Sequence, residues 1–305
     1  MPELRVGERH WQVPAGSNLL DALNAAGVAV PYSCRAGSCH ACLVHCLEGL
    51  PEDHNPAALA AEKRQAGWRL ACQCEVVQDL RVAAFDPQAD GIGAHLIGCD
   101  WLADSILRLR VLAERPIRYR AGQHCVLWGP GAVARPYSLA SLPQADEYLE
   151  FHIDCRHPGA FSDAARQFRL GDSLQLGELR GGALHYDPDW QLRPLWLLAS
   201  GTGLAPLFGV LREALRQEHQ GPIRLLHLAE QHYLAGPLQQ LADAHPQLSI
   251  ELLPHGERPN LRLLSRQTIA LACGSPASVE AFSRGMFLAG LPRNQLFADV
   301  FVGRG

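Results

Sequence analysis

Four cysteines constrain the first third of this 305-residue chain more than any other feature. Cys34, Cys39 and Cys42 follow the spacing C-x4-C-x2-C, and Cys72 supplies a distant fourth thiol. This is the ligand spacing of a plant-type [2Fe–2S] cluster. A small loop that contains Gly37 can wrap one edge of such a cluster. A structural zinc site usually needs paired CxxC or HxxxH elements, so the spacing favours an iron–sulfur cluster over zinc or over buried free cysteines.

Two further cysteines, Cys46 and Cys74, lie close to this set in the sequence. Each is interpreted as a small core residue and not as a fifth ligand. The chain has 10 cysteines, too few for a disulfide scaffold. Its first residues carry charges at Glu3 and Arg5 with no apolar segment behind them, unlike a secretory signal. We therefore expect a reducing, cytoplasmic environment.

The charges are unevenly distributed along the chain. Residues 1–90 hold 11 acidic and 7 basic side chains, whereas the remaining residues hold 20 of each. The net charge of −4 gives no basic excess of the kind that nucleic-acid binding requires. The acidic N-terminal part is expected to bind a protein partner with a basic patch, although a charge of this size is also typical of ordinary solubility.

Hydrophobic periodicity divides the chain into three predicted domains, over residues 1–90, 94–190 and 191–305. In the second, residues 107–111 and 149–153 alternate apolar and polar side chains, which predicts an antiparallel sheet or barrel. In the third, apolar runs alternate with helical stretches such as 207–217, which predicts an α/β fold with a parallel sheet covered on both faces. The apolar runs are 195–199, 223–228, 248–253 and 269–273.

Two local features mark the first domain and its end. A helix is expected over the apolar positions from Leu19 to Ala26, with Ser17 as N-cap and Gly27 at its end. The turn-forming residues 85–93 predict a linker.

The longest uncharged run, residues 194–211, has 18 residues, close to the lower limit for a membrane span. Glycines and a proline within it indicate a buried strand, a loop and the start of a helix instead. No membrane span is predicted.

A short motif in the second domain has the chemistry to bind a flavin. The ring of Tyr137 can lie along an isoalloxazine, the guanidinium of Arg135 can meet a pyrophosphate, and Ser138 can donate a hydrogen bond near N5. FAD is expected, and FMN stays possible because no adenine pocket is evident. The candidate flavin-binding residues are Arg135, Pro136, Tyr137, Ser138, His152, Gly159, Ala160, Phe161 and Ser162.

A glycine-rich turn follows the first apolar run of the third domain. Gly201 and Gly203 lie where a strand turns into a helix, so bare backbone can approach a dinucleotide and the helix N-terminus can favour a phosphate. The alternative is a tight βα turn with no ligand. Thr202 and Pro206 complete this candidate nicotinamide-binding segment.

The order of these motifs resembles that of the ferredoxin–NADP reductase superfamily, with an N-terminal domain that is similar to plant and adrenal ferredoxins. The resemblance implies a β-grasp ferredoxin domain, an antiparallel β-barrel that binds FAD, and an α/β domain for the nicotinamide cofactor. Residues 272–276 resemble the C-G-P element of the family, which adds Cys273 and Gly274 to the cofactor-binding candidates, and residues 299–301 resemble its E-x-F ending. The catalytic residues implied are Ser138, Cys273, Asp299 and Phe301.

The resemblance also implies the reaction. NADH would reduce the flavin, and electrons would pass through the [2Fe–2S] cluster to a protein acceptor such as an oxygenase. Two alternatives remain: a reductase of a sugar-deoxygenation or other non-oxygenase system, and a redox sensor with low turnover.

Two positions carry more specific expectations. His40 stands where many relatives have glycine, and its imidazole would either modulate the cluster or be a solvated loop side chain. Glu230 follows the strand at residues 223–228, where an acid would bind ribose hydroxyls and repel a 2′-phosphate, so NADH is expected over NADPH. Arg224 or His232 within reach would oppose this preference, and an outward-pointing Glu230 would remove its basis.

Overall fold

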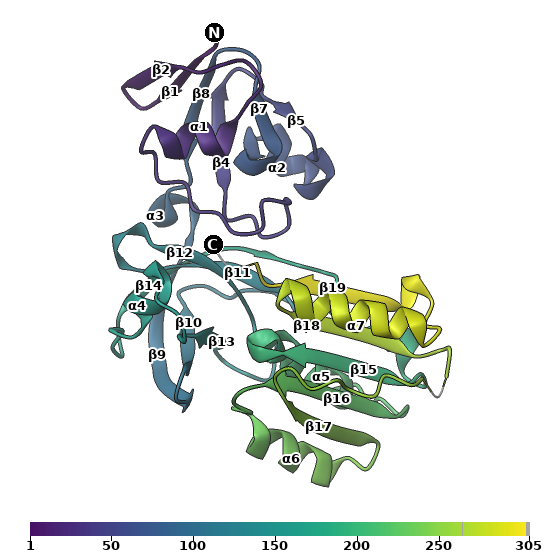
Figure 1. Ribbon diagram of the computed structural model, residues 1–305. Coiled ribbons are helices and arrows are strands. Elements are labelled where there is room, and N and C mark those ends of the chain that lie inside the picture. Colours follow the sequence, from purple (N-terminus) through teal and green to yellow (C-terminus); the bar gives the residue numbers. More distant parts are fainter. Residues whose placement is uncertain (264, 303–305) are drawn as a thin grey trace.

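The computed structural model describes residues 1–263 and 265–302, in which three groups of strands follow one another along the chain (Figure 1). The first group forms a five-stranded sheet of order β2-β1-β8-β4-β6 and a small sheet of order β3-β7-β5. Its elements are β1 (Glu3–Val6), β2 (Arg9–Gln12), β3 (Ser17–Asn18), α1 (Leu19–Ala25), β4 (Leu43–Glu48), β5 (Glu52–Asp53), η1 (Pro56–Ala58), α2 (Ala61–Gln65), β6 (Trp68–Leu70), η2 (Ala71–Gln73), β7 (Cys74–Val76) and β8 (Leu80–Ala84).

Helix α1 packs against this mixed sheet, which is the predicted β-grasp arrangement. Strand β1 is antiparallel to β2 but parallel to β8, and Leu19, Leu20 and Leu23 of α1 share one core with the strands. The N-cap is Asn18, whose side chain accepts from the Asp21 N–H at 3.3 Å. The prediction of Ser17 as the cap was wrong, because its hydroxyl donates to the carbonyl of Pro14.

The second group is a six-stranded antiparallel sheet of order β12-β11-β14-β9-β10-β13. An isolated bridge between Leu139 and Phe151 joins its two edges, so the sheet curls into the predicted barrel. Its elements are α3 (Pro87–Asp90), β9 (Ile92–Ala103), β10 (Ile106–Ala113), β11 (His124–Trp128), η3 (Pro130–Ala132), β12 (Ala134–Ser138), β13 (Leu149–Asp154), α4 (Ala160–Ala165) and β14 (Ser173–Arg180).

The segment expected as a linker is partly ordered into helix and strand. Asp86 accepts from the Gln88 N–H at 2.9 Å and so caps α3, in which Pro87 takes a first-turn position. The same turn-forming residues thus build a short helix.

The third group is a fully parallel five-stranded sheet of order β17-β16-β15-β18-β19. The segment after β14 includes η4 (Pro188–Trp190). The elements of the sheet and its helices are β15 (Leu195–Ser200), η5 (Gly201–Gly203), α5 (Leu204–Arg216), β16 (Ile223–Ala229), α6 (Ala235–Ala244), β17 (Leu248–Pro254), β18 (Ile269–Gly274), α7 (Pro276–Leu288), η6 (Arg293–Gln295) and β19 (Leu296–Val300).

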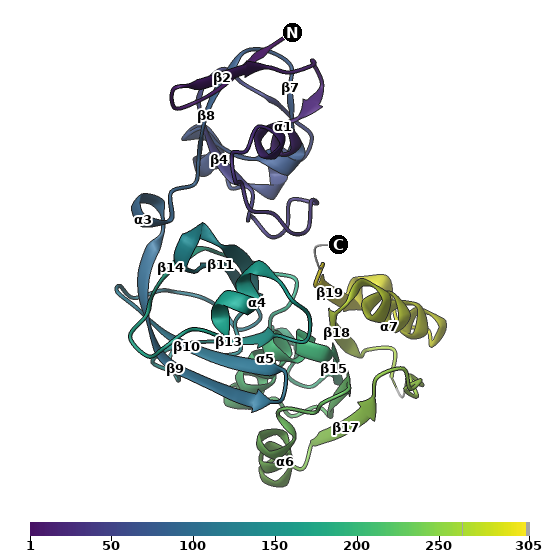
Figure 2. The same ribbon diagram turned by 60° about the vertical axis from the view of Figure 1, so that its left-hand side comes forward.

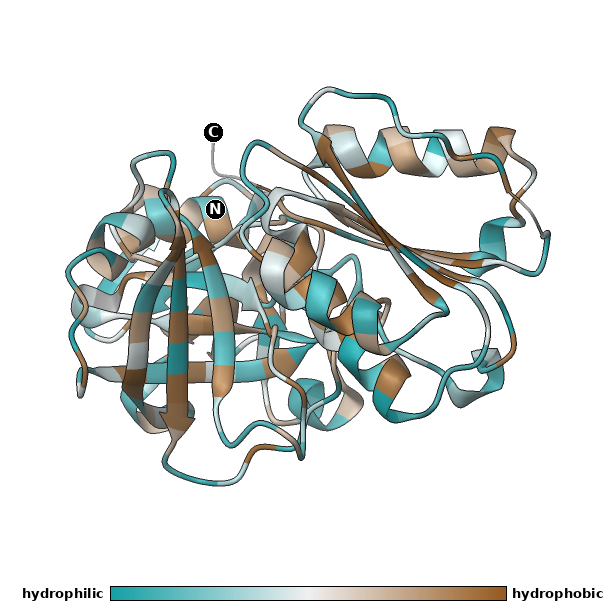
Figure 3. Ribbon diagram, turned by 90° about the horizontal axis from the view of Figure 1, so that it is seen from below, coloured by the Kyte–Doolittle hydropathy of each residue, from teal (hydrophilic) through white to brown (hydrophobic). Residues whose placement is uncertain are grey.

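Helices cover both faces of the parallel sheet, as predicted. Leu195, Leu197 and Ala199 of β15 face a core that includes α5 and α6, whereas Trp196 and Leu198 face one that includes α7. Figure 3 shows the largely hydrophobic strands between these helices. The uncharged run 194–211 forms β15, η5 and half of α5, and none of the described helices is long and apolar enough to cross a membrane.

The N-terminal sheets lie directly on the barrel (Figure 2). Trp128 of β11 belongs to the N-terminal core, and its ring stacks on that of Phe85 with centroids 5.5 Å apart. Lys63 of α2 forms an ion pair with Glu178 of β14 at 2.7 Å. These contacts hold the cysteine-bearing loop against the rest of the chain.

Candidate functional site

The four predicted cysteine ligands lie together at the end of the N-terminal part that faces the barrel. Cys34, Cys39 and Cys42 belong to the loop of residues 33–42 between α1 and β4, here called the cluster loop, and Cys72 lies in η2. The Cys39 thiol next to the Cys34 sulfur, together with Ser38, lowers the pKa of the Cys34 thiol. The Cys42 thiol next to the Cys72 sulfur lowers the pKa of the Cys72 thiol in the same way.

The surroundings of these sulfurs suit thiolate ligands. The backbone N–H groups of Ala36 and Cys39 point at the Cys34 sulfur at 3.4 and 3.3 Å, and the Gln73 amide donates to the Cys72 sulfur at 3.3 Å. Gly37 has a φ of 80°, and a Cβ there would lie 3.1 Å from the Cβ of Ala58. Only glycine fits this turn without strain.

The cysteines form two pairs and not one cage. In the described part of the chain, no three histidine, cysteine or acidic side chains are grouped so that they could hold one metal ion. Two thiol pairs fit a two-iron cluster with four cysteine ligands. Burial raises the pKa of Cys46 to about 11 and also raises that of Cys74, as expected of core thiols.

His40 is not a solvated loop residue. Its side chain is buried between the cluster loop and the barrel, its φ is 56°, and it bonds the carbonyl of Ala58. Burial lowers the pKa of His40 to about 4. The expectation of a solvated imidazole was wrong, because the N-terminal sheets pack onto the barrel at this point.

A cavity of about 350 Å³, here called the Tyr137 cavity, lies between the cluster loop, β12 and the end of the parallel sheet. Cys34 and Cys39 line it, which brings the cluster loop into its wall. The predicted site residues that line it are Arg135, Pro136, Tyr137, Ser138, His152, Thr202, Asp299 and Phe301. The cavity therefore joins parts of all three strand groups.

The side chains of this cavity offer a flat wall and polar groups. The Tyr137 ring packs against Phe161 with centroids 4.9 Å apart, and burial raises its pKa. Ser138 is buried at the end of β12, and Arg135 lies three residues earlier in the same strand. This set has the chemistry of a flavin site, with an apolar plane, a hydroxyl donor and a guanidinium.

Residues 159–162 do not line the Tyr137 cavity. The Gly159 N–H donates to the Asp163 carboxylate at 3.1 Å, and the Ser162 hydroxyl donates to the carbonyls of His157 and Gly159. Ala160 begins α4, and Phe161 is buried beneath Tyr137. The Gly159 N–H and the Ser162 hydroxyl are therefore engaged within their own turn.

A second cavity, of about 210 Å³, opens at the glycine-rich turn and is here called the Gly201 cavity. Gly201, Thr202, Glu230 and Phe301 are the predicted residues that line it. Asp154, Thr202 and Phe301 line both cavities, so the two adjoin. Two ligands bound in them would meet at these shared residues.

Close packing behind the turn requires two of the predicted glycines. A Cβ on Gly203 would lie 2.2 Å from the Cys273 carbonyl oxygen, and one on Gly274 would lie 2.7 Å from the Cβ of Ser200. Cys273 itself is fully buried in the core, where burial raises the pKa of its thiol, and neither it nor Pro206 lines either cavity. The alternation of β18 turns the Cys273 side chain toward α5 instead.

Glu230 meets a cation that was not expected from the sequence. Its carboxylate pairs with Arg156 at 3.1 Å, and Arg156 also pairs with Asp154. Arg224 pairs with Glu251 instead, and His232 contacts His227 at 3.3 Å. The Glu230 side chain is 62% exposed at the edge of the Gly201 cavity.

Several lining residues were missed at the sequence level. Asp154 ends β13 and Arg156 follows it, Tyr233 follows β16, and His124 starts β11. The only available signal was their place at the ends of predicted strands, where loops gather around a site.

Comparison with known proteins places these features in a family. Residues 5–77 match the 2Fe-2S iron–sulfur cluster binding domain. The chain is 30% identical to the ferredoxin–NAD(P)(+) reductase component of the naphthalene 1,2-dioxygenase system of Pseudomonas putida, over 95% of each sequence. The chain belongs to the family of ferredoxin–NAD(P) reductase components.

Other relatives agree with this membership. The reductase is 30% identical to reductase component 2 of terephthalate 1,2-dioxygenase from Comamonas sp., over 94% of its own length and 93% of the relative's. Its fold matches the crystal structure of an Amycolatopsis cytochrome P450 reductase over 99% of both chains, with a TM-score of 0.68 and 27% identity. It is an oxidoreductase that carries electrons from a nicotinamide dinucleotide through a flavin and a [2Fe–2S] cluster to a protein acceptor.

Proposed function

We propose that this reductase is the NADH-dependent electron-transfer component of an oxygenase system, with FAD in the Tyr137 cavity and the nicotinamide in the Gly201 cavity. The observation that carries the proposal is the continuity of the two cavities through Asp154, Thr202 and Phe301, with Cys34 in the wall of the first. Electron donor, flavin and cluster would then follow one another along one short line.

The residues of the Tyr137 cavity would hold and orient the flavin. A bound flavin accepts two electrons as a hydride and can give them up one at a time, which no side chain here can do. Tyr137 supplies a half-buried flat wall, Ser138 a buried hydroxyl, and Arg135 a cation for the pyrophosphate. Asp299 and Phe301, next to the end of β19, close the opposite side. Acid release followed by chromatography distinguishes FAD from FMN.

The metal ligands of the proposal are Cys34, Cys39, Cys42 and Cys72, whose sulfurs already form two pairs. Because Cys34 and Cys39 line the same cavity as Tyr137, the flavin and the cluster would be near neighbours. Three domains, residues 1–90, 94–190 and 191–305, are proposed to carry the cluster, the flavin and the nicotinamide.

The preference for NADH rests on Glu230. Its carboxylate can accept hydrogen bonds from ribose hydroxyls, and it already neutralises Arg156, the nearest cation in the cavity. A 2′-phosphate would meet two carboxylates, Glu230 and Asp154, against this one guanidinium.

The test compares kcat/KM for NADH and NADPH with ferricyanide as acceptor. Glu230→Arg should move the ratio toward NADPH by at least about tenfold, because a charge pair at 4 Å in water is worth about 1 kcal/mol and the substitution changes the charge by two. Glu280→Arg on α7 makes the same change at an exposed position outside both cavities and should leave the ratio unmoved. A wild type that prefers NADPH refutes the proposal for this residue.

The acceptor and location complete the proposal. The relatives named above serve naphthalene and terephthalate dioxygenases, which supports an oxygenase as the physiological acceptor. All 10 cysteines are free, which supports a reducing cytoplasm. The proposed acceptor is tested by reducing a purified oxygenase component whose gene lies beside that of this chain. The proposed cytoplasmic location is tested by fractionation of the source cells.

A further inference from the structure

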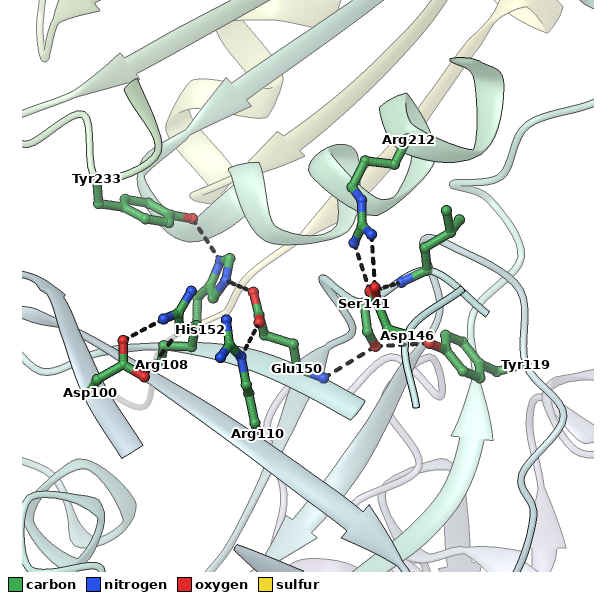
Figure 4. Close-up of polar contacts among 11 residues, drawn as sticks. Asp100, Arg108, Arg110, Tyr119, Ser141, Asp146, Glu150, His152, Arg212 and Tyr233 are labelled. Carbon is green, nitrogen blue, oxygen red and sulfur yellow. Dashed lines mark hydrogen bonds and ion pairs between the residues drawn. The ribbon is translucent and has the colours of Figure 1, made fainter. Parts of the chain in front are cut away.

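A chain of buried polar contacts crosses the boundary between the barrel and the parallel sheet (Figure 4). Arg110 of β10 donates to Glu150 Oε2 at 2.9 Å, and His152 Nε2 lies 3.0 Å from Glu150 Oε1. The other ring nitrogen, His152 Nδ1, lies 3.2 Å from the Tyr233 hydroxyl. Tyr233 belongs to the loop after β16, so the last contact joins the two parts.

Every polar atom in the middle of this chain has a partner. The His152 side chain is fully buried, and that of Glu150 is 9% exposed. The Glu150 carboxylate accepts from Arg110 and lies within hydrogen-bond distance of His152 Nε2. The Tyr233 hydroxyl lies within hydrogen-bond distance of the other ring nitrogen, Nδ1. Neither ring nitrogen of His152 is left to bind a flavin directly.

The contact between Tyr233 and His152 joins the walls of the two cavities. Tyr233 lines the Gly201 cavity and His152 lines the Tyr137 cavity. The Tyr233 ring also meets His227 edge-on, with centroids 5.8 Å apart, and His227 Nε2 contacts the Gly201 carbonyl at 3.0 Å. A displacement of Tyr233 would therefore be passed to the glycine-rich turn.

A separate ion pair holds the same two parts together at a distance from the cavities. Arg212 of α5 binds both oxygens of Asp146 at 2.6 and 2.8 Å, and Asp146 also accepts from the Leu142 N–H at 2.7 Å. None of these residues lines either cavity. Loss of the Tyr233 hydroxyl should therefore leave the parallel sheet attached to the barrel.

We propose that Tyr233 is a positioning residue for hydride transfer, which acts through its hydrogen bond to His152. The inference rests on the proposed flavin and nicotinamide sites. In the transfer, the C4–H bond of the nicotinamide breaks, a bond to flavin N5 forms, and the electron pair moves with the hydrogen nucleus. Tyr233 exchanges no atom in this step. It fixes the distance between the two cavities, on which the rate depends steeply.

The chain contains a matched control for this hydroxyl. The Tyr186 hydroxyl lies 3.0 Å from His219 Nδ1, and both side chains are buried. Their rings meet edge-on at 5.6 Å and 77°, close to the 5.2 Å and 83° of Tyr233 and His152. Neither residue lines the cavities. Tyr186→Phe thus removes an equivalent hydrogen bond without touching the proposed hydride path.

The experiment measures flavin reduction by saturating NADH in rapid mixing. Tyr233→Phe should slow it by about ten- to a hundredfold and raise the primary isotope effect with C4-deuterated NADH, whereas Tyr186→Phe should match the wild type. The KM for NADH should change by less than about threefold, because the Tyr233 hydroxyl is engaged with His152 and the substitution leaves the ring in the cavity wall. His152→Gln disrupts the same contact from the barrel side and should slow flavin reduction in the same way. It replaces Tyr233→Phe in the experiment if that variant does not fold.

A second measurement tests the same contact in protein that holds no cofactor. In the flavin-free protein, hydrogen–deuterium exchange of residues 201–203 and 230–234 should be faster in Tyr233→Phe than in Tyr186→Phe. Equal reduction rates in the two variants, or equal exchange, overturn the inference. If NADH does not reduce the flavin of the wild type, the proposed function is contradicted instead. The exchange measurement then still decides whether the contact between Tyr233 and His152 holds the two cavity walls together.

Discussion

Replacing Glu150 by glutamine should destabilise the barrel by an amount that depends on pH. Burial opposes ionisation of this carboxyl, but the hydrogen bonds from His152 and Arg110 outweigh it and lower the pKa of Glu150 to about 2, against an ordinary 4.5. Each tenfold change in the acid constant is worth about 1.4 kcal/mol, so the ionised carboxylate contributes roughly 3 kcal/mol to folding at neutral pH. Glutamine cannot make this contribution.

The direction of this pH dependence follows from the lowered pKa of Glu150. A carboxyl whose folded-state pKa is depressed stabilises the protein above its unfolded pKa, and this stabilisation disappears as the pH falls through 4.5 toward 2. The difference between wild type and Glu150→Gln should therefore be largest at pH 6–7 and fall to roughly half by pH 3. A loss of 1 kcal/mol lowers the midpoint of thermal unfolding by about 2–4 °C, so the midpoint of Glu150→Gln should lie roughly 6–12 °C below that of the wild type at neutral pH.

The assay follows thermal release of the flavin by its fluorescence, at several pH values from 7 to 3. Glu147→Gln, at an exposed position in the loop before β13, removes the same charge and should change the midpoint by less than about 2 °C. Loss of the cluster in acid affects all variants alike, so the comparison uses differences between them. The reasoning would be refuted if the thermal midpoints of wild type and Glu150→Gln differed little at pH 7, or if their difference grew as the pH fell.

Three further predictions concern the cluster, the glycine-rich turn and the acceptor. Cys72→Ser should lose or distort the EPR signal of the reduced cluster, whereas Cys74→Ser should keep it, and an unchanged Cys72→Ser spectrum would exclude this ligand. Gly203→Ala should raise the KM for NADH at least about tenfold, because the added Cβ would collide with the backbone of β18, while Gly236→Ala, with open space around it, should not. Reduction of the protein acceptor should slow as salt rises if the acidic residues 1–90 guide docking, and flat rates from low to high salt would contradict this.

The parallel sheet could be predicted closely from the sequence because its strands are buried on both faces. Such strands appear as continuous apolar runs, and the run expected over residues 223–228 is strand Ile223–Ala229 in the structure. Short helices were harder to predict from the sequence. The turn-forming residues before β9 are compatible both with a linker and with the capped helix Pro87–Asp90.

The site could be predicted only where a motif is continuous in sequence. Motif residues such as Tyr137 and Thr202 do line the two cavities. Arg156 beside Glu230, and Tyr233 beside His152, are contacts between distant segments, the latter 81 residues apart. No local pattern marks such partners, because tertiary packing alone brings them together.

Lys63 is the only lysine in the chain. Its ammonium pairs with Glu178 on the barrel and lies 5.2 Å from the centroid of the Trp68 ring, so it lies at the contact between the N-terminal sheets and the barrel. An amine-reactive dye can therefore label only two places, Lys63 and the terminal amino group. The rate at which Lys63 is modified, read by peptide mass, therefore reports whether an added acceptor protein changes the exposure of this contact.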